Sequence, residues 1–208
     1  MASRDWNEDY AQGHPPWDTG QPDEHLLELV RQGAIPPGRA LEVGCGTGTN
    51  SAWLAEQGFS VVGVDVAPLA VEAARTRARG RGLECTFEVL DFLSAEVPGG
   101  PFDFAFDRGC FHVFDAPEAR ARFAERIAAL LRPGGVWLSL IGSTEGAPRD
   151  VGPPRRSARD VLAAIEPALE LLELRSTVFE TTRGDAPAAW VCRSRLRSVP
   201  AQPSTVRD

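Results

Sequence analysis

The sequence predicts a single, doubly wound α/β domain: a mostly parallel sheet with helices on both faces and an antiparallel hairpin at one edge. Three observations support this prediction. Between residues 39 and 141, short apolar runs alternate with longer helical segments, which is typical of a parallel sheet. The runs near 170–182 and 188–196 have no helical segment between them, so they predict the hairpin. The chain has 208 residues, of which 43% are hydrophobic, and this length suits one domain.

Helices are expected where a capping residue or a proline precedes a helix-forming run and where glycine or proline follows it. A short N-terminal helix is expected to end at the Gly13-His14-Pro15-Pro16 stretch. The next helix begins after Asp23, carries an apolar stripe, and ends before Pro36. Pro68 begins a longer helix, which Gly80 ends. In chain order, the expected helices are 3–11, the segment between Asp23 and Pro36, 50–57, 68–79, 117–131 and 157–166.

Strands are expected at the apolar runs between these helices. The run from Ser60 to Val64 is rich in β-branched residues and ends at an acidic residue. In chain order, the expected strands are 39–43, 60–64, 84–90, 102–106, 136–141, 170–182 and 188–196. A loop rich in glycine, proline and arginine spans 142–156. The last residues, 198–208, are rich in proline and serine and are expected to form a flexible tail.

The composition excludes several classes of protein. A net charge of −7 argues against a partner with a phosphate backbone. No apolar run approaches the roughly eighteen residues of a membrane span, and the polar N-terminus resembles neither a signal peptide nor a transit peptide. All 22 basic residues are arginine, which excludes Schiff-base chemistry and a P-loop lysine. The four cysteines are scattered, which argues against a disulfide scaffold or a metal site and favours a reducing, cytoplasmic location.

The strongest local motif is Leu41-Glu42-Val43-Gly44-Cys45-Gly46-Thr47-Gly48, at the end of a strand and the start of a helix. Because Gly44 and Gly46 lack a β-carbon, a ligand can approach the backbone, and the helix N-terminus offers free N–H groups. The alternative is an ordinary tight turn, but three alternating glycines exceed what a turn requires. The spacing also differs from the G-x-G-x-x-G of dinucleotide-binding loops. Glu42 would repel a pyrophosphate and suits a cationic amine, which disfavours a nicotinamide-dependent oxidoreductase.

Acidic residues also end the next two predicted strands. Asp65 comes 17 residues after Gly48, where a carboxylate can accept two hydrogen bonds from a ribose diol. Asp91 and Phe92 end the third strand, and such a pair can bind an adenine amino group and pack against its ring. Each acid alone is also a common helix cap. Acids in register at consecutive strand ends favour a nucleoside-binding edge.

Four motifs together resemble the class I S-adenosylmethionine-dependent methyltransferases: the glycine-rich loop, Asp65, Asp91-Phe92, and Leu131 to Gly135. The resemblance covers roughly residues 35–195 and implies a Rossmann-like, seven-stranded sheet with S-adenosylmethionine as cofactor. It also implies that the glycine-rich loop holds the methionyl part, the second acid the ribose and the third the adenine. Carried over to this chain, the implied cofactor-binding residues of these motifs are Glu42, Gly44, Cys45, Gly46, Asp65, Val66, Asp91 and Phe92.

The N-terminal segment resembles a narrower group. Residues 6–22 match the pattern W-x-x-x-[WY]-x-x-G-x-x-P-W-D-x-G-x-P of the thiopurine, thiol/halide and tellurite-type methyltransferases. In that group the segment folds over the cofactor, which implies a helical lid over 1–34 and a cofactor-binding domain over 35–197. Trp6, Tyr10 and Trp17 would then surround the sulfonium, because aromatic faces attract a cation and exclude water. The alternative is that Trp17 only packs the N-terminal helix onto the sheet.

The fourth strand ends in Asp107 and Arg108, and the same group carries such a pair beside both cofactor and acceptor. The resemblance implies that Asp107 faces the methionyl amino end of the cofactor. Arg108 could attract an anionic acceptor, or it could pair with Asp107 or Glu42. His112 could be a general base, because its ordinary pKa suits neutral pH, or a structural histidine. Cys110 could bind the acceptor, although an isolated cysteine more often packs.

These features predict an enzyme that transfers a methyl group from S-adenosylmethionine to a small soft nucleophile: a thiol, a selenium or tellurium species, or a halide. Such acceptors need little or no base, and His112 and Arg108 are the candidate catalytic residues. The alternatives are methylation of oxygen or nitrogen on a small metabolite, and a non-catalytic S-adenosylmethionine-binding protein. The expected partner is a small-molecule acceptor, without nucleic acid, membrane or metal, and the chain is expected to be a monomer or weak dimer. Arg149, Arg155 and Arg156 of the 142–156 loop form either a solvated face or an anion site.

Overall fold

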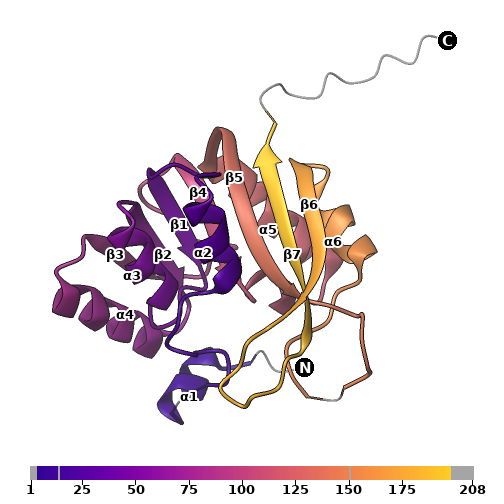
Figure 1. Cartoon of the computed structure of the whole chain (residues 1–208), viewed down its shortest axis with the longest axis horizontal. Helices are drawn as coiled ribbons and strands as arrows, with labels where there is room; N and C mark the ends of the chain where they lie inside the picture. The colour runs from indigo at the N-terminus through magenta and orange to yellow at the C-terminus, as the bar shows by residue number, and fades with distance from the viewer. Residues whose placement is uncertain (1–3, 14, 150, 198–208) are drawn as a thin grey trace.

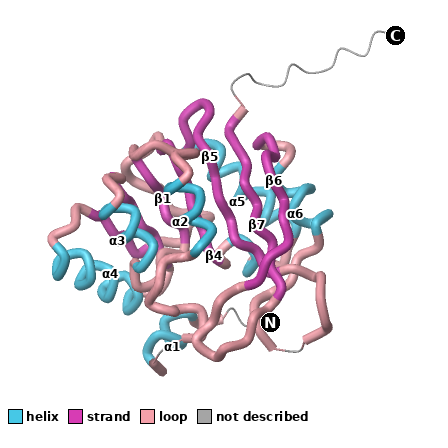
Figure 2. The backbone as a smooth tube through the Cα atoms, viewed as in Figure 1, coloured by secondary structure: helices cyan, strands magenta, loops and turns pink. Residues whose placement is uncertain are grey.

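The computed structural model describes residues 4–13, 15–149 and 151–197. Its strands are β1 (Arg39–Val43), β2 (Ser60–Asp65), β3 (Cys85–Val89), β4 (Phe102–Arg108), β5 (Leu131–Gly142), β6 (Leu169–Val178) and β7 (Ala188–Leu196). They form one seven-stranded sheet in the order β3-β2-β1-β4-β5-β7-β6, with helices on both faces (Figures 1 and 2). The predicted Rossmann-like α/β fold is therefore confirmed. The segment 198–208, predicted to be a flexible tail, lies outside the described residues.

The first five strands are parallel, and the last two form the predicted hairpin. β1 pairs with β2 and β4, β2 pairs with β3, and β4 pairs with β5, all in parallel. β7 lies between β5 and β6 and runs antiparallel to both, so β6 is the edge strand. The carboxyl ends of the parallel strands consequently meet at one edge of the sheet, where open α/β sheets bind their ligands.

The helices are α1 (Trp6–Ala11), α2 (Glu24–Arg31), α3 (Thr49–Glu56), α4 (Pro68–Arg81), the 3₁₀ turn η1 (Phe111–Val113), α5 (Pro117–Leu130) and α6 (Ala158–Ile165). Most of them begin with a proline in the first turn or with a side chain that accepts from the first free N–H groups, whereas α3 begins after Gly48 without a side-chain cap. Asp23 caps α2 by accepting a hydrogen bond from the His25 N–H, and Ser157 and Asp160 form a capping box at α6. None of the described helices is both long and apolar enough to cross a membrane.

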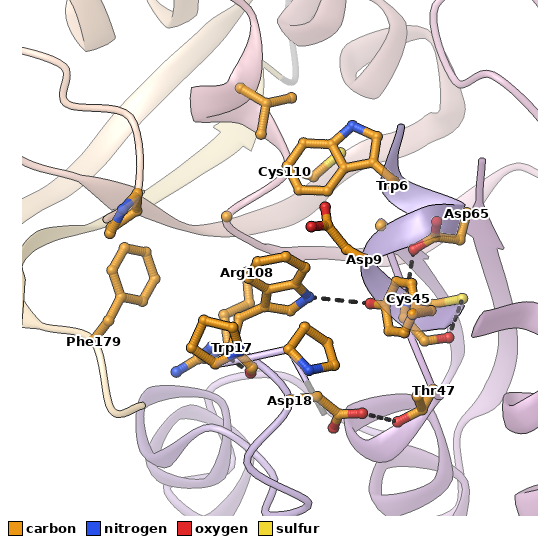
Figure 3. Close-up of a pocket in the computed structure, with 18 of the residues that line it drawn as sticks. Trp6, Asp9, Trp17, Asp18, Cys45, Thr47, Asp65, Arg108, Cys110 and Phe179 are labelled. Carbon is orange, nitrogen blue, oxygen red and sulfur yellow. Dashed lines mark hydrogen bonds between the residues drawn. The ribbon is translucent and has the colours of Figure 1, made fainter. Parts of the chain in front are cut away.

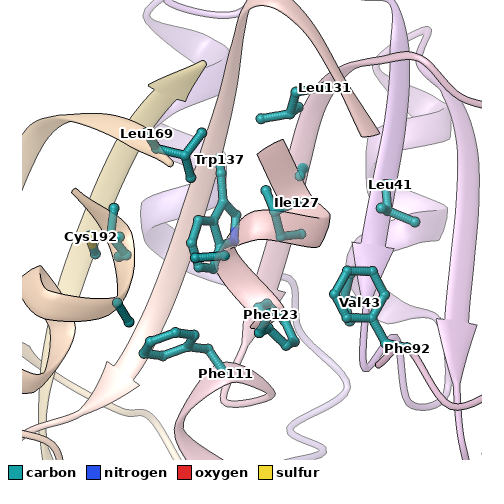
Figure 4. Close-up of a cluster of buried hydrophobic side chains, with 14 of the residues drawn as sticks. Leu41, Val43, Phe92, Phe111, Phe123, Ile127, Leu131, Trp137, Leu169 and Cys192 are labelled. Carbon is teal, nitrogen blue, oxygen red and sulfur yellow. The ribbon is translucent and has the colours of Figure 1, made fainter. Parts of the chain in front are cut away.

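Apolar side chains cover the central strands on both faces. On one face, α5 and α6 pack against β5 around the fully buried Trp137, with Phe123 and Ile127 of α5 beside it (Figure 4). On the other face, Leu26 of α2 and Leu54 of α3 belong to a second buried cluster with side chains of β1 and β4. A strand buried on both faces has no polar side to alternate with, which explains the nearly continuous apolar runs in the sequence.

Two strand boundaries differ from the prediction. β5 begins at Leu131, which pairs with Phe102, and the 132–135 segment predicted as a turn is an irregular start of this strand, with a register shift against β4. β6 ends at Val178 instead of continuing to residue 182. The chain leaves the sheet there, because only the Phe179 N–H still bonds across the hairpin, to the carbonyl of Pro187. The released loop, 179–187, lies at the edge of the sheet that holds the cavity.

Candidate active site

A cavity of about 860 Å³ opens at the carboxyl ends of β1, β2 and β4 (Figure 3). Residues of α1, which packs against α4 below this edge of the sheet (Figure 1), also line it. The residues that line the cavity come from three parts of the chain: the N-terminal segment, the ends of the parallel strands, and the loops after β5 and β6. The residues predicted for the site that line it are Trp6, Tyr10, Trp17, Glu42, Gly44, Cys45, Gly46, Asp65, Val66, Asp91, Phe92, Arg108 and His112.

The glycine-rich loop has a backbone that requires glycine. Gly44 and Gly46 have φ values of 69° and 52°, in the left-handed region that side chains disfavour. A β-carbon on Gly44 would lie 2.9 Å from Cβ of Cys110, and one on Gly46 would lie 2.8 Å from Oη of Tyr10. The loop is tied to β2, because the N–H groups of Gly44 and Cys45 both donate to the carbonyl of Val64. The loop therefore presents bare backbone to the cavity in a fixed conformation.

Glu42 is buried and bonded on both oxygens, so its role differs from a free carboxylate facing a ligand. One oxygen accepts from Nδ2 of Asn50 at 3.0 Å and the other from Oγ of Ser51, both on α3. Burial raises its pKa to about 7, while the hydrogen bonds from Ser51 and Asn50 lower it. Glu42 thus fixes the first turn of α3 against the end of β1.

Asp65 and Asp91 stand at the ends of β2 and β3 with their oxygens toward backbone donors. The carboxylate of Asp65 accepts from the N–H groups of Gly46 and Ala67, each at 2.9 Å, and burial raises its pKa. Asp91 accepts from the Leu93 N–H at 3.0 Å and from a serine hydroxyl. The capping alternative is thus partly correct, yet a carboxylate oxygen has two lone pairs and each acid keeps capacity for a ligand.

Two apolar residues near these acids, Phe92 and Val66, differ in exposure: the larger side chain is buried and the smaller one is exposed. The Phe92 ring, predicted to pack on a base, is 5% exposed and lies 4.7 Å from the ring of Phe123 in the core. Val66, by contrast, is 51% exposed and lines the cavity. Both residues line the cavity, and Val66 is the more exposed of the two.

Asp107 does not line the cavity, which corrects the expectation that it faces the methionyl end of a cofactor. Its carboxylate is fully buried and accepts from the N–H groups of Cys110 and Phe111 and from the indole N–H of Trp137, at 2.9–3.0 Å. Burial raises its pKa to about 6. Asp107 therefore holds the turn that leads from β4 into η1.

Arg108 pairs with neither Asp107 nor Glu42. Its Nε donates to Asp23 at 2.8 Å, and both side chains are largely buried, with exposures of 12% and 7%. Its Nη atoms donate to the carbonyls of Trp17 and Glu180. The guanidinium also lies 5.2 Å from the centre of the Phe179 ring. Arg108 therefore joins the N-terminal segment to the loop after β6 (Figure 3).

The N-terminal aromatic residues gather over the glycine-rich loop. The indole N–H of Trp17 donates to Oη of Tyr10 at 3.2 Å, and the rings of Trp6 and Trp17 meet edge to face at 5.7 Å. Asp18, next in the chain, accepts from the hydroxyl of Thr47 at 2.9 Å (Figure 3). Trp17 thus belongs to a cluster that lines the cavity, beyond packing α1 onto the sheet.

His112 is hydrogen-bonded through one ring nitrogen and its pKa is lowered, which favours the structural role of the two left open for it. Its Nδ1 accepts from the Gly142 N–H at 2.7 Å. Its pKa is lowered to about 3, mainly by burial and in addition by the charges of Arg156, Arg149 and Arg108. A histidine in this state is no general base at neutral pH. The Cys110 thiol is no nucleophile there either, because burial and then the charge of Asp107 raise its pKa well above the ordinary range.

The arginines of the loop after β5 bond to backbone carbonyls and do not line the cavity. Arg149 donates to the carbonyl of Pro153, Arg155 to that of Ser143, and Arg156 to that of His112. The surface of this loop that faces the cavity is apolar instead. The loop residues that line the cavity are Val151, Gly152, Pro153 and Pro154.

Comparisons with known proteins agree with this geometry. A family model described as a methyltransferase domain matches residues 40–135. The chain is 36% identical to the probable thiol methyltransferase 2 of Arabidopsis thaliana, covering 74% of this chain and 67% of that protein. It is 32% identical to thiocyanate methyltransferase 1 of Brassica oleracea, covering 77% and 72%. The chain belongs to the class I S-adenosylmethionine-dependent methyltransferases.

Two further similarities extend the comparison. The 2-heptyl-1-hydroxyquinolin-4(1H)-one methyltransferase of Mycobacteroides abscessus is 34% identical, but the match spans 67% of this chain and only 61% of that protein. TehB from Haemophilus influenzae has the same fold, with a TM-score of 0.73 at 18% identity over 92% of this chain and 67% of that one. The narrower resemblance to the thiol methyltransferase group is thus supported by relatives of that name.

The site of this methyltransferase fits S-adenosylmethionine, the cofactor of the family. The glycine-rich loop leaves a cradle that β-carbons would fill, and α3 begins beside it at a residue without a side-chain cap, so N–H groups remain for a ligand. Asp65 and Asp91 supply acceptors for hydroxyl and amino groups at neighbouring strand ends. The aromatic rings of Trp6, Tyr10 and Trp17 suit a sulfonium cation.

Sequence reasoning missed several residues of the methyltransferase cavity. Asp18, Thr47, Val113, Phe114 and Phe179 line it although no motif marked them as site residues. Asp18 and Thr47 are predictable from the sequence, because Asp18 lies in the N-terminal pattern and Thr47 in the glycine-rich motif. The others are not, because their place depends on how the loops after β4 and β6 fold over the sheet.

Proposed function

We propose that this chain transfers the methyl group of S-adenosylmethionine to a small acceptor that is already nucleophilic at neutral pH, in the first place a thiolate. One observation supports this most directly: His112, the only histidine that lines the cavity in the described residues, offers no base. Its Nδ1 accepts from Gly142 and its pKa is lowered to about 3 by burial and by three arginines. A hydroxyl of high pKa would stay protonated in such a site, whereas a thiol ionises readily.

The cofactor assignment is part of this proposal. Backbone groups at Gly44 and Gly46 would hold the methionyl part, Asp65 the ribose hydroxyls, and Asp91 the adenine amino group beside Val66. These groups support the assignment because they lie in this order along the edge of the sheet, at the ends of β1, β2 and β3. The segment 1–34 would act as a lid over the domain formed by 35–197.

The mechanism follows from what the chain's own residues do. When bound, S-adenosylmethionine supplies a methyl group on a positively charged sulfur. Trp17 and Tyr10 exclude water and favour positive charge next to their rings. Arg108 holds the N-terminal segment and the loop after β6 together, and both segments line the cavity where the acceptor would bind.

A second candidate acceptor is an acidic hydroxyl on an aromatic ring. The apolar lining formed by Val113, Phe114, Phe179 and Pro187 supports it, since this surface exceeds what a halide or a tellurium oxyanion needs. The relative from Mycobacteroides abscessus, a 2-heptyl-1-hydroxyquinolin-4(1H)-one methyltransferase by name, points the same way. Such a hydroxyl shares with a thiol the property that matters here, ionisation without an enzymatic base.

The experiment is a release assay for S-adenosylhomocysteine against thiols, selenite, tellurite, iodide, phenols and an N-hydroxyquinolone. For each accepted thiol, kcat/KM is measured from pH 5 to 9. Without an enzymatic base, the rise of kcat/KM with pH follows the pKa of each thiol and moves from one thiol to the next. An inflection at one constant pH for all thiols would reveal a base and contradict the proposal. Turnover restricted to phenols of high pKa would do so as well.

A further inference from the structure

His112 occupies a position in the acceptor part of the cavity that its role as a partner of Gly142 does not fully explain. It lies in η1 with 5% of its surface exposed, and it lines the cavity. A β-carbon on Gly109 would lie 3.3 Å from Nε2, so this nitrogen faces the Gly109 backbone, which also lines the cavity. The ring of Phe179 meets the imidazole edge to face at 5.7 Å.

The hydrogen bond to Gly142 determines which nitrogen carries the proton. The Gly142 N–H can only donate, and it donates to Nδ1 at 2.7 Å, so Nδ1 bears a lone pair. A neutral imidazole with a lone pair on Nδ1 carries its proton on Nε2. Burial, and after it the charges of nearby arginines, lower the pKa of His112 and oppose a second proton, so the ring stays neutral through the neutral and mildly acidic range.

The Nε2–H donor finds no hydrogen-bonding partner among residues 4–13, 15–149 and 151–197. Nε2 is not one of the fully buried polar atoms that lack a partner in the described residues, so it is accessible from the cavity that His112 lines. A rigid, neutral and unpaired donor next to a cavity is suited to bind an oxygen of a ligand.

We propose that the Nε2–H of His112 donates a hydrogen bond to the methyl acceptor, and that it selects acceptors with an oxygen lone pair beside the nucleophilic atom. This inference rests on the proposed function and specifies its substrate class: small thiols with a neighbouring carbonyl oxygen. The reacting sulfur needs its lone pair free for in-line attack, so a donor aimed at the sulfur would slow transfer. A donor aimed at a neighbouring oxygen instead orients the acceptor and leaves the sulfur free.

Two isomeric probes test the proposal: methyl 2-mercaptobenzoate and methyl 4-mercaptobenzoate. They have the same atoms, but only the first has its carbonyl next to the sulfur. We expect wild-type protein to give a higher kcat/KM for the first isomer, and the ratio between the isomers to fall about tenfold in His112→Asn. Asparagine keeps an acceptor near the Gly142 N–H and lacks a donor at the Nε2 position. His25→Asn is the matched control, because His25 bonds to Thr177 outside the cavity.

A general loss of structure would lower both rates together and leave their ratio unchanged, so an unchanged ratio in a folded His112→Asn protein overturns the inference. Equal rates for the two isomers in the wild type also overturn it. A measurement on the wild type needs neither turnover nor a variant. In the ¹⁵N NMR spectrum of protein saturated with S-adenosylhomocysteine, the Nε2 proton of His112 should shift with the first isomer and not with the second. If no thiol is methylated, the proposed function fails, while this NMR comparison still decides the role of His112.

Discussion

The contact between Arg108 and Asp23 leads to the most direct test of how the cavity is closed. The two residues are 85 positions apart, and their ion pair at 2.8 Å is largely buried. Removing one partner of a buried pair leaves the other charge without compensation, which typically costs about 3–5 kcal/mol. Because 12% of the Arg108 side chain remains exposed, we expect Arg108→Met to lower the free energy of unfolding by about 3 kcal/mol, the low end of that range.

A double-mutant cycle with Asp23→Asn isolates the pair, because asparagine keeps an oxygen to cap α2 at the His25 N–H. We expect a coupling energy of about 2 kcal/mol, measured by urea unfolding at pH 7. The control is the exposed pair of Arg79 and Glu72 on α4, with side-chain exposures of 64% and 59%. Its cycle of Arg79→Met and Glu72→Gln should give about 0.5 kcal/mol or less. Equal coupling in the two cycles would refute the reasoning that Arg108 locks the N-terminal segment onto the sheet.

Three further predictions concern the strand ends and His112. Asp65→Ala should weaken S-adenosylhomocysteine binding at least tenfold in calorimetry, and an unchanged affinity would reject Asp65 as the ribose ligand. Gly44→Ala should lower the free energy of unfolding by about 2 kcal/mol in urea, because φ is 69° and the new β-carbon meets Cys110 at 2.9 Å; an unchanged stability would show that the loop is less constrained than the structure indicates. His112 stays neutral in the native state down to about pH 3 but takes up a proton near pH 6.5 when unfolded, so its contribution to stability falls as the pH decreases from 6.5. Between pH 6.5 and 4.5, wild-type protein should therefore lose about 2 kcal/mol more than His112→Asn in urea unfolding, and parallel losses would contradict this.

The part of the site that the sequence predicted is the part that local geometry determines. Gly44 and Gly46 follow a strand and precede a helix, so their conformation is set within a few residues. Asp65 and Asp91 come to the same edge because parallel strands end together. For these residues, the position in the sequence is therefore enough to predict the place in the fold.

The predictions that were wrong or incomplete depend on contacts between distant segments. Asp107 lies near the end of a strand as the other acids do. Its carboxylate, however, is buried in the core, where it accepts a hydrogen bond from the indole N–H of Trp137, 30 residues away. Arg108 pairs with Asp23, which no strand-end pattern indicates. The ring of Phe92 lies in the core because Phe123 of α5 packs against it. A single sequence contains the residue types for these contacts and no information on which of them meet.

The cavity has a part proposed for the cofactor, which local geometry determines, and a part proposed for the acceptor, which depends on contacts between distant segments. The groups proposed for the cofactor lie on β1, β2, β3 and the turns after them, all within the region from 40 to 135 that matches a methyltransferase domain. The residues proposed for the acceptor come from three places: 112–114 inside that region, and 151–154 and 179–187 beyond it. Loops can change without disturbing strand register, whereas the glycine-rich loop cannot accept a β-carbon at Gly44. Relatives named for thiol, thiocyanate and hydroxyquinolone methyl transfer can therefore share one cofactor site, and we propose that the loops and His112 determine the acceptor of this chain.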